Sequence, residues 1–411
     1  MTDPFERVRD LLREILPHNR FWQARYRDLG DLPLSIRDAD DFARLPFVTK
    51  ADLLEDQRID PPYGSIPTYP LAAYSRLHQT SGTTTGQPMR WLDTPKSWDW
   101  FCETWARFWP LAGVVPGDRF FFPFSFGPFF GFWCGFDGAV RAGHLSLAGG
   151  GMSSSARVRL IVDHRPTVLC ATPSYALHLG EAARKEGIDP ADTSIRAVLL
   201  AGEPGGSIPS TRARIESMWG ARAIDHYGMT EVGPVAIEPH DRPMSLSVCP
   251  DRYISETIEP DGVRPSAVGE IGELVLTPLG REGSPLFRYR TGDLVRRGPD
   301  DERGWPNFPG GILSRTDDMI LIRGNNVYPS SIEAIVRRFP EVVEFRLEVD
   351  RTRPLTQLSI VLEPSHPSDS LAEAVSEAIR RELLFRADVR LVEPGTLPRF
   401  ELKAKRLVRI D

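Results

Sequence analysis

The chain contains 411 residues, too many for one ordinary domain and enough to bury a large core. Its 50 basic and 56 acidic residues give a formal net charge of −6, which argues against a nucleic-acid-binding protein or a polybasic membrane anchor. The four cysteines are scattered without a Cys-x-x-Cys pair, a pattern typical of the reducing cytoplasm. His240 and Cys249 alone are too few ligands to predict a metal site.

The N-terminal residues 5–16 predict an amphipathic helix, because apolar side chains recur at helical spacing between charged ones. Charges throughout this stretch argue against a signal peptide. We therefore expect a cytoplasmic protein that does not bind a membrane.

The segment from His78 to Pro88 is rich in hydroxyl groups and glycine. Four threonines, one serine and two glycines make up the seven residues from Thr80 to Gly86, and none of them can fill a core. Glycine lets backbone N–H groups point one way, so the loop can form a nest for a polyphosphate. It is not a Walker A loop, since no Gly-Lys-Ser/Thr follows. A surface Ser/Thr/Gly linker is the alternative.

The most apolar run extends from Phe120 to Phe136, where ten of seventeen residues are aromatic. It is too short to span a bilayer and is interrupted by glycine and proline. Such a stretch forms either plain core or the wall of a pocket for a flat ligand, and both interpretations stay open at this point.

Residues 156–237 alternate strand and helix signals, as βαβ units do. We expect a buried strand at 167–171, a helix capped by Ser174 that ends near Gly187, and a further strand at 195–201. After Tyr253 the pattern changes to short strands with turns, which include residues 272–277 and 286–290.

The tail has a different pattern, which predicts a compact α+β unit of roughly 95 residues, large enough to fold alone. Its predicted helices cover residues 331–338 and 369–385, and its predicted strands cover 343–349 and 356–363. The second helix carries an apolar stripe at Leu371, Val375, Ile379 and Leu383. We place the boundary near residues 315–317.

Further segments share the character of the Thr-rich loop, with glycine and polar residues at the ends of apolar runs. They are residues 201–204 (Ala-Gly-Glu-Pro), 226–231 (His-Tyr-Gly-Met-Thr-Glu), 289–293 (Tyr-Arg-Thr-Gly-Asp), 314–318 continuing into 322–324, and 397–406. In this order they resemble the adenylate-forming superfamily of acyl-CoA synthetases, luciferases and nonribosomal adenylation domains. Residues 45–53 and 323–333 resemble signatures of its phenylacetate–CoA ligase branch, which includes other aryl-CoA ligases.

Two positions depart from the superfamily pattern. The phosphate loop has one threonine more than the usual Ser-Gly-Thr-Thr-Gly core, and Met89-Arg90 stands where many members place a lysine. Loss of that lysine weakens charge neutralisation at the phosphates, although the phenylacetate branch also tends to lack it.

The resemblance implies an α/β fold in two domains. Residues 1–314 would form a large adenylation domain of βαβ sheets plus a β-rich subdomain, and residues 315–411 a small mobile α+β domain. The implied reaction is ATP-dependent activation of an aromatic carboxylic acid to an acyl-adenylate, followed by transfer to coenzyme A with release of AMP. Mg²⁺ is expected beside the crowded phosphates. An aryl-AMP ligase that loads an acyl carrier protein or an amine, and an inert adenylate-binding homologue, are the alternatives.

The resemblance also assigns roles residue by residue. Glu231 would bind Mg²⁺, since a carboxylate suits this hard cation, and Thr230 would contact the α-phosphate. Asp293 would accept both ribose hydroxyls. Lys403 would enter the site only during adenylation and stabilise charge in the transition state, and Lys405 is the alternative lysine.

Other expected contacts follow from the same motifs. Asp317 would be the hinge of the small domain, and Gly324 would admit the pantetheine arm of coenzyme A. The aromatic run offers no Lys or Asp to clamp an amino acid, so a flat aromatic acid is favoured over an amino or fatty acid. Its pocket would be lined by Phe126, Phe129, Phe132, Ala201 and Met229. The remaining ATP and AMP contacts would be Ser81, Gly82, Thr83, Thr84, Thr85, Gly86, Gly202, Glu203, Pro204, Asp225, His226, Tyr227, Gly228 and Arg315.

Overall fold

The structure, a computed structural model, describes residues 3–80, 88–322, 325–350, 357–366, 370–400 and 404–410. Contacts divide the chain into two compact units, each built from two stretches of sequence. The first unit comprises Met1–Gly151 and His226–Pro309, and the second comprises Met152–Asp225 and Gly310–Asp411. This division places residues 152–225 together with the C-terminal tail, so it does not test the expected boundary between residues 314 and 315. That boundary stays a prediction.

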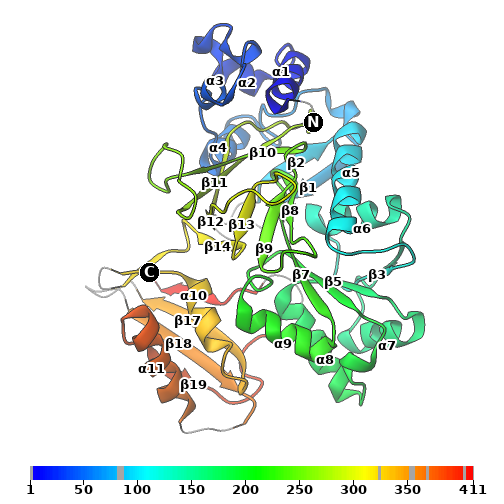
Figure 1. Cartoon of the computed structure of the whole chain (residues 1–411), viewed down its shortest axis with the longest axis vertical. Coiled ribbons are helices and arrows are strands. Elements are labelled where there is room, and N and C mark those ends of the chain that lie inside the picture. The colour runs from blue at the N-terminus through cyan, green and yellow to red at the C-terminus, as the bar shows by residue number, and fades with distance from the viewer. Residues whose placement is uncertain are drawn as a thin grey trace. The chain divides into compact units, whose positions relative to one another are not determined.

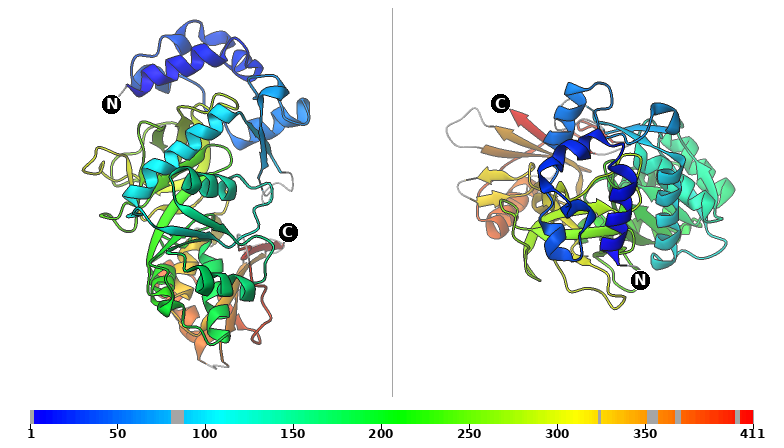
Figure 2. Two further views of the ribbon diagram at one scale, coloured as in Figure 1. Left: turned by 90° about the vertical axis from the view of Figure 1, so that its right-hand side faces the viewer. Right: turned by 90° about the horizontal axis from the view of Figure 1, so that it is seen from above.

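Short helices begin the first unit and gather at one end of it, drawn in blue in Figure 2. The expected N-terminal helix is confirmed as α1, which buries Val8, Leu11, Leu12 and Ile15 along one face. Helix α4 begins at a capping box, in which Thr49 and Asp52 each bond the other's backbone N–H. The elements are α1 (Pro4–Ile15), α2 (Arg20–Arg25), η1 (Arg27–Leu29), η2 (Leu32–Leu34), α3 (Ala39–Ala43), α4 (Lys50–Ile59) and η3 (Leu71–Ala73).

The aromatic run folds partly as a strand and partly as a helix, joined by residues 123–129. Its strand buries Phe120, Phe121 and Phe122, so this part of the run is core. The strand pairs in parallel with the next one through a helical crossover. The elements here are the antiparallel hairpin β1 (Arg76–Gln79) and β2 (Arg90–Asp93), then α5 (Pro95–Leu111), β3 (Arg119–Phe122), α6 (Phe130–Arg141) and β4 (Leu145–Ala148).

The rest of the first unit is β-rich, as expected after Tyr253. The predicted strand at 272–277 is confirmed as β11, whereas the strand expected at 286–290 begins only at Tyr289. Arg288 has a φ of 47°, which breaks the extended backbone just before that strand. Next to the end of β7, in sheet order, lie β8 (Gly233–Ile237), β9 (Ser245–Val248) and β13 (Asn307–Pro309). A second, antiparallel set consists of β10 (Tyr253–Ile258), β11 (Ile271–Pro278) and β12 (Tyr289–Arg296).

The second unit begins with the expected βαβ alternation, in which β5, β6 and β7 run parallel. The predicted helix after β5 is present, but its cap is Thr172, whose hydroxyl accepts from the N–H of Tyr175. Pro173 occupies the first helical position, so Ser174 lies inside the first turn and the expected cap was wrong. The elements are α7 (Ser154–His164), β5 (Val168–Ala171), α8 (Pro173–Lys185), η4 (Pro190–Asp192), β6 (Ala197–Leu200), α9 (Pro209–Trp219) and β7 (Arg222–Met229), which continues into the first unit.

The C-terminal part of the second unit confirms the expected α+β pattern. A four-stranded sheet in the order β19-β18-β17-β20 packs with two helices around one apolar core, coloured from yellow through orange to red in Figure 1. Leu371, Val375 and Ile379 of the predicted stripe are buried in it. The elements are β14 (Ile312–Arg315), β15 (Ile320–Ile322), β16 (Asn325–Val327), α10 (Pro329–Val336), β17 (Val342–Asp350), β18 (Gln357–Pro364), α11 (Leu371–Leu383), β19 (Asp388–Leu391) and β20 (Leu407–Ile410).

The architecture as a whole is mixed α/β, which confirms the predicted fold class. Within the described part of the chain, no helix has the length and apolar character that a membrane crossing requires.

Candidate active site

The turn between β7 and β8 carries Thr230 and Glu231, the pair expected at the phosphate and the metal. Glycine makes this turn tight. A Cβ on Gly233, where φ is 93°, would lie 2.3 Å from a ring carbon of Phe101, and a Cβ on Gly228 would lie 2.7 Å from the carbonyl oxygen of Gly233. These two glycines therefore limit how Thr230 and Glu231 leave the strand.

A buried arginine holds the same turn from behind. Nη1 of Arg281 donates to the carbonyl oxygens of Thr230 and Glu231 at 2.9 and 2.6 Å. Its Nε and Nη2 donate to the two oxygens of Asp93 at 2.8 and 2.9 Å. The Arg281 and Asp93 side chains are both 0% exposed, with His78 3.7 Å from Asp93. Burial raises the pKa of Asp93, but the Arg281 charge, the hydrogen bonds from Arg281 and the nearby His78 together outweigh burial and hold that pKa below its usual value. The pair is therefore charged and fixes the turn.

Glu231 is 4% exposed, and among the described residues no side chain bonds to its carboxylate. The described residues also contain no group of three or more His, Cys, Asp or Glu that could hold a metal by themselves. Mg²⁺ needs no such cage, because it binds through one or two carboxylates together with substrate phosphates and water. The single Glu231 carboxylate beside the Thr230 hydroxyl fits that type of site.

Two residues expected at the nucleoside lie in direct contact. The Tyr227 hydroxyl on β7 donates to Oδ2 of Asp293 on β12 at 2.6 Å, and Asp293 is 5% exposed. The N–H of Asp293 also donates to the Thr291 hydroxyl at 3.0 Å, directly after Gly292 with its φ of 75°. The structure thus brings a phenol and a carboxylate from two sheets of the first unit to one place.

His226 points away from Tyr227, because successive side chains of a strand face opposite sides. Its ring stacks on Trp105 with the centroids 4.3 Å apart and lies edge-on to Phe108. Burial lowers the pKa of His226 to about 3, so the imidazole is neutral at physiological pH. The structure gives this residue a packing role, and its expected nucleotide contact stays a prediction.

The loop after β6 carries Gly202, Glu203 and Pro204, at the carboxyl end of a parallel strand where ligands bind in this type of sheet. The Glu203 carboxylate already has two backbone partners. Oε1 accepts from the N–H of Ser174 at 2.7 Å, and Oε2 accepts from the N–H of Ala404 at 2.6 Å. Besides its expected role beside the adenine, Glu203 therefore links α8 to the C-terminal segment.

Asp225 and Arg315 are the other expected nucleotide contacts in the second unit. Asp225 accepts from the Ser207 hydroxyl, and a Cβ on Gly206 would lie 2.3 Å from its Oδ1, so only glycine fits there. Arg315 ends β14 and donates from Nε to the carboxylate of Asp317, the expected hinge, at 2.8 Å. None of these contacts tests the predicted roles.

The aromatic residues expected at the acid form one cluster with their neighbours in the first unit. Phe132 stacks on Phe124 with the centroids 4.0 Å apart, and Phe129 meets Phe132 edge-on at 6.0 Å. Phe126 contacts Trp133, whose indole N–H donates to the Gly127 carbonyl oxygen at 2.8 Å. Met229 lies beside Tyr227, whose hydroxyl is 3.7 Å from its sulfur. Ala201 belongs to the second unit.

The phosphate loop itself lies outside the described residues, but its base is described. Thr80 and Met89 close it with a backbone hydrogen bond of 2.9 Å, and the Thr80 hydroxyl accepts from the N–H of Met89 at 3.0 Å. The β1–β2 hairpin therefore brings the two ends of the loop together. The predicted site residues that lie outside the described residues are Ser81, Gly82, Thr83, Thr84, Thr85, Gly86, Gly324 and Lys403.

A surface cavity of about 810 Å³ lies elsewhere in the first unit, lined by residues from Pro17 to Leu92. None of the predicted site residues is among those that line it.

Sequence reasoning missed Arg281 and Asp93, which support the Thr230–Glu231 turn. A weak signal exists, since Gly280-Arg281-Glu282-Gly283 resembles the other glycine-flanked polar segments at strand ends. Nothing local, however, indicates that an arginine 188 positions from its carboxylate partner will pair with it.

The chain matches two family models, that of the AMP-binding enzymes over residues 77–277 and that of the AMP-binding enzyme C-terminal domain over residues 324–409. It is 31% identical to a phenylacetate-coenzyme A ligase of Thermus thermophilus, with 96% of this chain and 93% of that protein aligned. It is 32% identical to a phenylacetate-coenzyme A ligase of Pseudomonas putida, with 97% and 91% aligned.

Among solved structures, the chain is similar to 2-hydroxyisobutyryl-CoA ligase in its postadenylation state with R3-HIB-AMP. The TM-score is 0.93 at 28% identity, covering 99% of this chain and 89% of that one. The same ligase with 2-HIB-AMP and CoA in its thioesterification state gives a TM-score of 0.74 at 29% identity, covering 99% and 88%.

The chain therefore belongs to the AMP-binding, adenylate-forming enzymes, in the group of the phenylacetate–CoA ligases, and the resemblance seen in the sequence is confirmed. It is an AMP-forming acid–CoA ligase, which activates a carboxylic acid with ATP and transfers the acyl group to coenzyme A.

Proposed function

We propose that the acid is aromatic, which makes the protein an aryl-acid:CoA ligase. The observation that carries this proposal is the cluster of Phe124, Phe126, Phe129, Phe132 and Trp133 around the turn that joins β3 to α6. Flat rings stack well on such side chains. Relatives support the choice, since the aligned phenylacetate-coenzyme A ligases and a 3-hydroxybenzoate–CoA ligase of Aromatoleum are named for aromatic acids.

The adenylation half-reaction needs the nucleotide held while the acid approaches. In our proposal, Asp293 and Tyr227 hold the ribose and adenine, and the Thr230 hydroxyl contacts the α-phosphate. An oxygen of the acid attacks the α-phosphorus, and the bond to pyrophosphate breaks. Glu231 is proposed as the carboxylate that binds Mg²⁺, which when present neutralises phosphate charge. Lys403 is proposed to stabilise the same charge from the small domain.

The second half-reaction forms the thioester. The thiol sulfur of coenzyme A attacks the acyl carbon of the adenylate, the thiol proton leaves, and AMP departs with the electron pair of the broken carbon–oxygen bond. Gly324 is proposed to admit the pantetheine arm, and Asp317 to be the hinge that changes the state of the small domain.

An acid panel tests the proposal. Pyrophosphate release and CoA thioester formation are measured with phenylacetate, benzoate, hydroxy- and aminobenzoates, 2-hydroxyisobutyrate and a medium-chain fatty acid. The highest kcat/KM is expected for one of the aromatic acids. A higher kcat/KM for 2-hydroxyisobutyrate or the fatty acid contradicts the aromatic assignment.

The acceptor is tested in the same reactions by replacing coenzyme A with a phosphopantetheinylated carrier protein. One relative supports this comparison, an L-proline–carrier protein ligase that is 32% identical over 44% of the chain. Preference for CoA is expected, and transfer only to the carrier protein contradicts it.

A further inference from the structure

The residues that follow Lys403 make defined contacts inside the second unit. The N–H of Ala404 donates to Oε2 of Glu203 at 2.6 Å, and the other oxygen of Glu203 accepts from the N–H of Ser174 at 2.7 Å. Glu203 therefore joins the first turn of α8 to the segment that begins one residue after the lysine.

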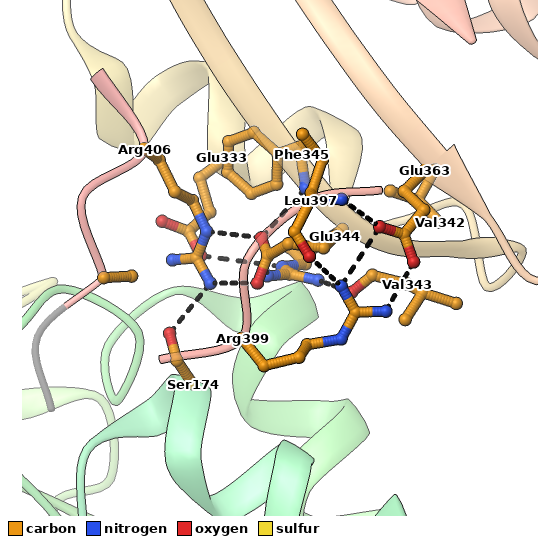
Figure 3. A network of polar contacts seen from close by, with 12 residues as sticks. Ser174, Glu333, Val342, Val343, Glu344, Phe345, Glu363, Leu397, Arg399 and Arg406 are labelled. Atoms are coloured by element: carbon orange, nitrogen blue, oxygen red, sulfur yellow. Dashed lines mark hydrogen bonds and ion pairs between the residues drawn. The ribbon is translucent and has the colours of Figure 1, made fainter. Parts of the chain in front are cut away.

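Arg406 reaches the same turn of α8 with its side chain, as Figure 3 shows. Its guanidinium donates to the Ser174 hydroxyl at 2.8 Å and, in a forked arrangement, to the two oxygens of Glu344 at 2.7 and 3.1 Å. Glu333 lies 3.5 Å away, and the guanidinium also covers the Phe345 ring at 4.9 Å. The side chains of Arg406, Glu333 and Glu344 are each at most 10% exposed.

These contacts fall into two groups. Glu333 and Glu344 are on α10 and β17 of the C-terminal part, like Arg406, so their ion pairs stay intact wherever that part moves. Ser174 and Glu203 belong to residues 152–225 instead. If contact with Ser174 is broken, Arg406 keeps two carboxylate partners and no buried charge is left alone, which avoids the large cost of an isolated ion.

We propose that Ser174 and Glu203 form a docking point for residues 404–406, and that Arg406 is a positioning residue that holds Lys403 ready for adenylation. This inference rests on the proposed role of Lys403. The docking point uses single hydrogen bonds to a hydroxyl and a backbone N–H, which break at modest cost, whereas the permanent pairs lie inside the C-terminal part. The segment can therefore leave after the first half-reaction without unfolding its own domain.

The test replaces Ser174, because Ser174→Ala removes the bond to Arg406 and leaves its ion pairs intact. ATP–pyrophosphate exchange is expected to fall about fivefold or more, while thioester formation from a synthetic acyl-adenylate changes less than twofold. Ser174→Thr keeps the hydroxyl and is expected to retain ATP–pyrophosphate exchange. The matched control is Ser376→Ala, which removes a hydrogen bond of 3.1 Å to the Ala387 carbonyl oxygen inside the C-terminal part and is expected to change neither half-reaction.

A second readout does not depend on turnover. Hydrogen exchange of peptides covering residues 404–410 is expected to accelerate in Ser174→Ala and to stay unchanged in Ser376→Ala. If Ser174→Ala leaves the hydrogen exchange of these peptides unchanged, or lowers the two half-reactions equally, the proposed docking point is overturned. A wild-type protein that is inactive with every acid contradicts the proposed function instead, and the hydrogen-exchange comparison still decides the inference.

Discussion

At the scale of single residues, the Thr230–Glu231 turn depends on two local glycines and on one arginine from a distant part of the chain. The Gly228 and Gly233 conformations shape it, and the guanidinium of Arg281 binds its two carbonyl oxygens. The Glu231 carboxylate is thus aimed by backbone contacts and does not need a side-chain partner of its own. This leaves its charge available for a cation.

The first prediction follows from that charge. Glu231→Gln keeps the size of the side chain and removes the charge expected to bind Mg²⁺. Acid-dependent ATP–pyrophosphate exchange should fall roughly thirtyfold, equivalent to ~2 kcal/mol of transition-state stabilisation, and higher Mg²⁺ should recover part of it. Near-normal exchange at low Mg²⁺ would remove Glu231 from the site.

His226 makes the second prediction, which concerns pH. Its pKa in the folded chain is lowered to about 3, against about 6.5 in an unfolded chain, so the unfolded state binds an extra proton as the pH falls below about 6.5. Protonation of His226 in the unfolded state therefore lowers the free energy of unfolding progressively as the pH falls from about 6.5 to 3. The loss is roughly 2 kcal/mol at pH 5.

His226→Phe keeps a ring on Trp105 and removes the titration. The difference in unfolding free energy between pH 8 and pH 5 should shrink by about 2 kcal/mol relative to wild type, as measured by denaturant titration. An unchanged difference would mean that the imidazole is protonated or solvated in the folded protein.

At the scale of elements, the strongly periodic segments were predictable and the local exceptions were not. The helix at 5–16, the strands at 167–171 and 195–201 and the tail helix at 369–385 are present within a few residues. The start of β12 was missed, because Arg288 adopts a positive φ while its side chain is held by Glu256. Such a conformation depends on tertiary contacts, which a local pattern does not contain.

The aromatic run shows the same limit. Its composition indicated core or pocket wall without deciding between them. The structure divides it, since Phe120–Phe122 are buried in β3 whereas Phe126, Phe129 and Phe132 are only partly buried near the start of α6. The second group is free to contact a ligand in a way that the first is not.

The third prediction concerns this partly buried group. Phe132→Ala removes the ring that stacks on Phe124 and enlarges the space beside it. Relative kcat/KM across substituted benzoates and phenylacetates should shift toward larger ring substituents. Phe120→Ala, a deletion in the buried part of the run, is the matched control and should lower the melting temperature without changing the ranking. If the two variants show the same ranking as wild type, the acid binds elsewhere.

At the scale of the whole molecule, the motifs predicted from the sequence fall in both units. Asp293, Tyr227 and Glu231 belong to the first unit, and Glu203 belongs to the second with the C-terminal segment. The motifs could be recognised in the sequence one by one, as Tyr227 and Asp293 were. Their direct contact could not, because 66 residues separate the two partners of that hydrogen bond.

The last two predictions separate the two half-reactions. If Lys403 acts only in adenylation, Lys403→Ala should abolish formation of the acyl-adenylate, and thioester formation from a supplied adenylate should remain largely intact. Lys405, which is exposed, provides the matched control, because Lys405→Ala removes the same charge two residues away. Equal loss of both half-reactions in Lys403→Ala, or the same defect in Lys405→Ala, would contradict the assignment.

Asp317→Pro should give the opposite result. Proline fixes φ at the proposed hinge and removes its N–H, so the change of state is blocked. Arg409 donates to the Asp317 carbonyl oxygen at 2.7 Å. Proline keeps this carbonyl oxygen, so the contact continues to favour the arrangement of the C-terminal segment seen in this structure. The acyl-adenylate should form at near wild-type rate in single-turnover experiments, whereas its transfer to CoA should fail. Loss of adenylation with intact transfer would mean that proline locks the second state, and no effect on either step would place the hinge elsewhere.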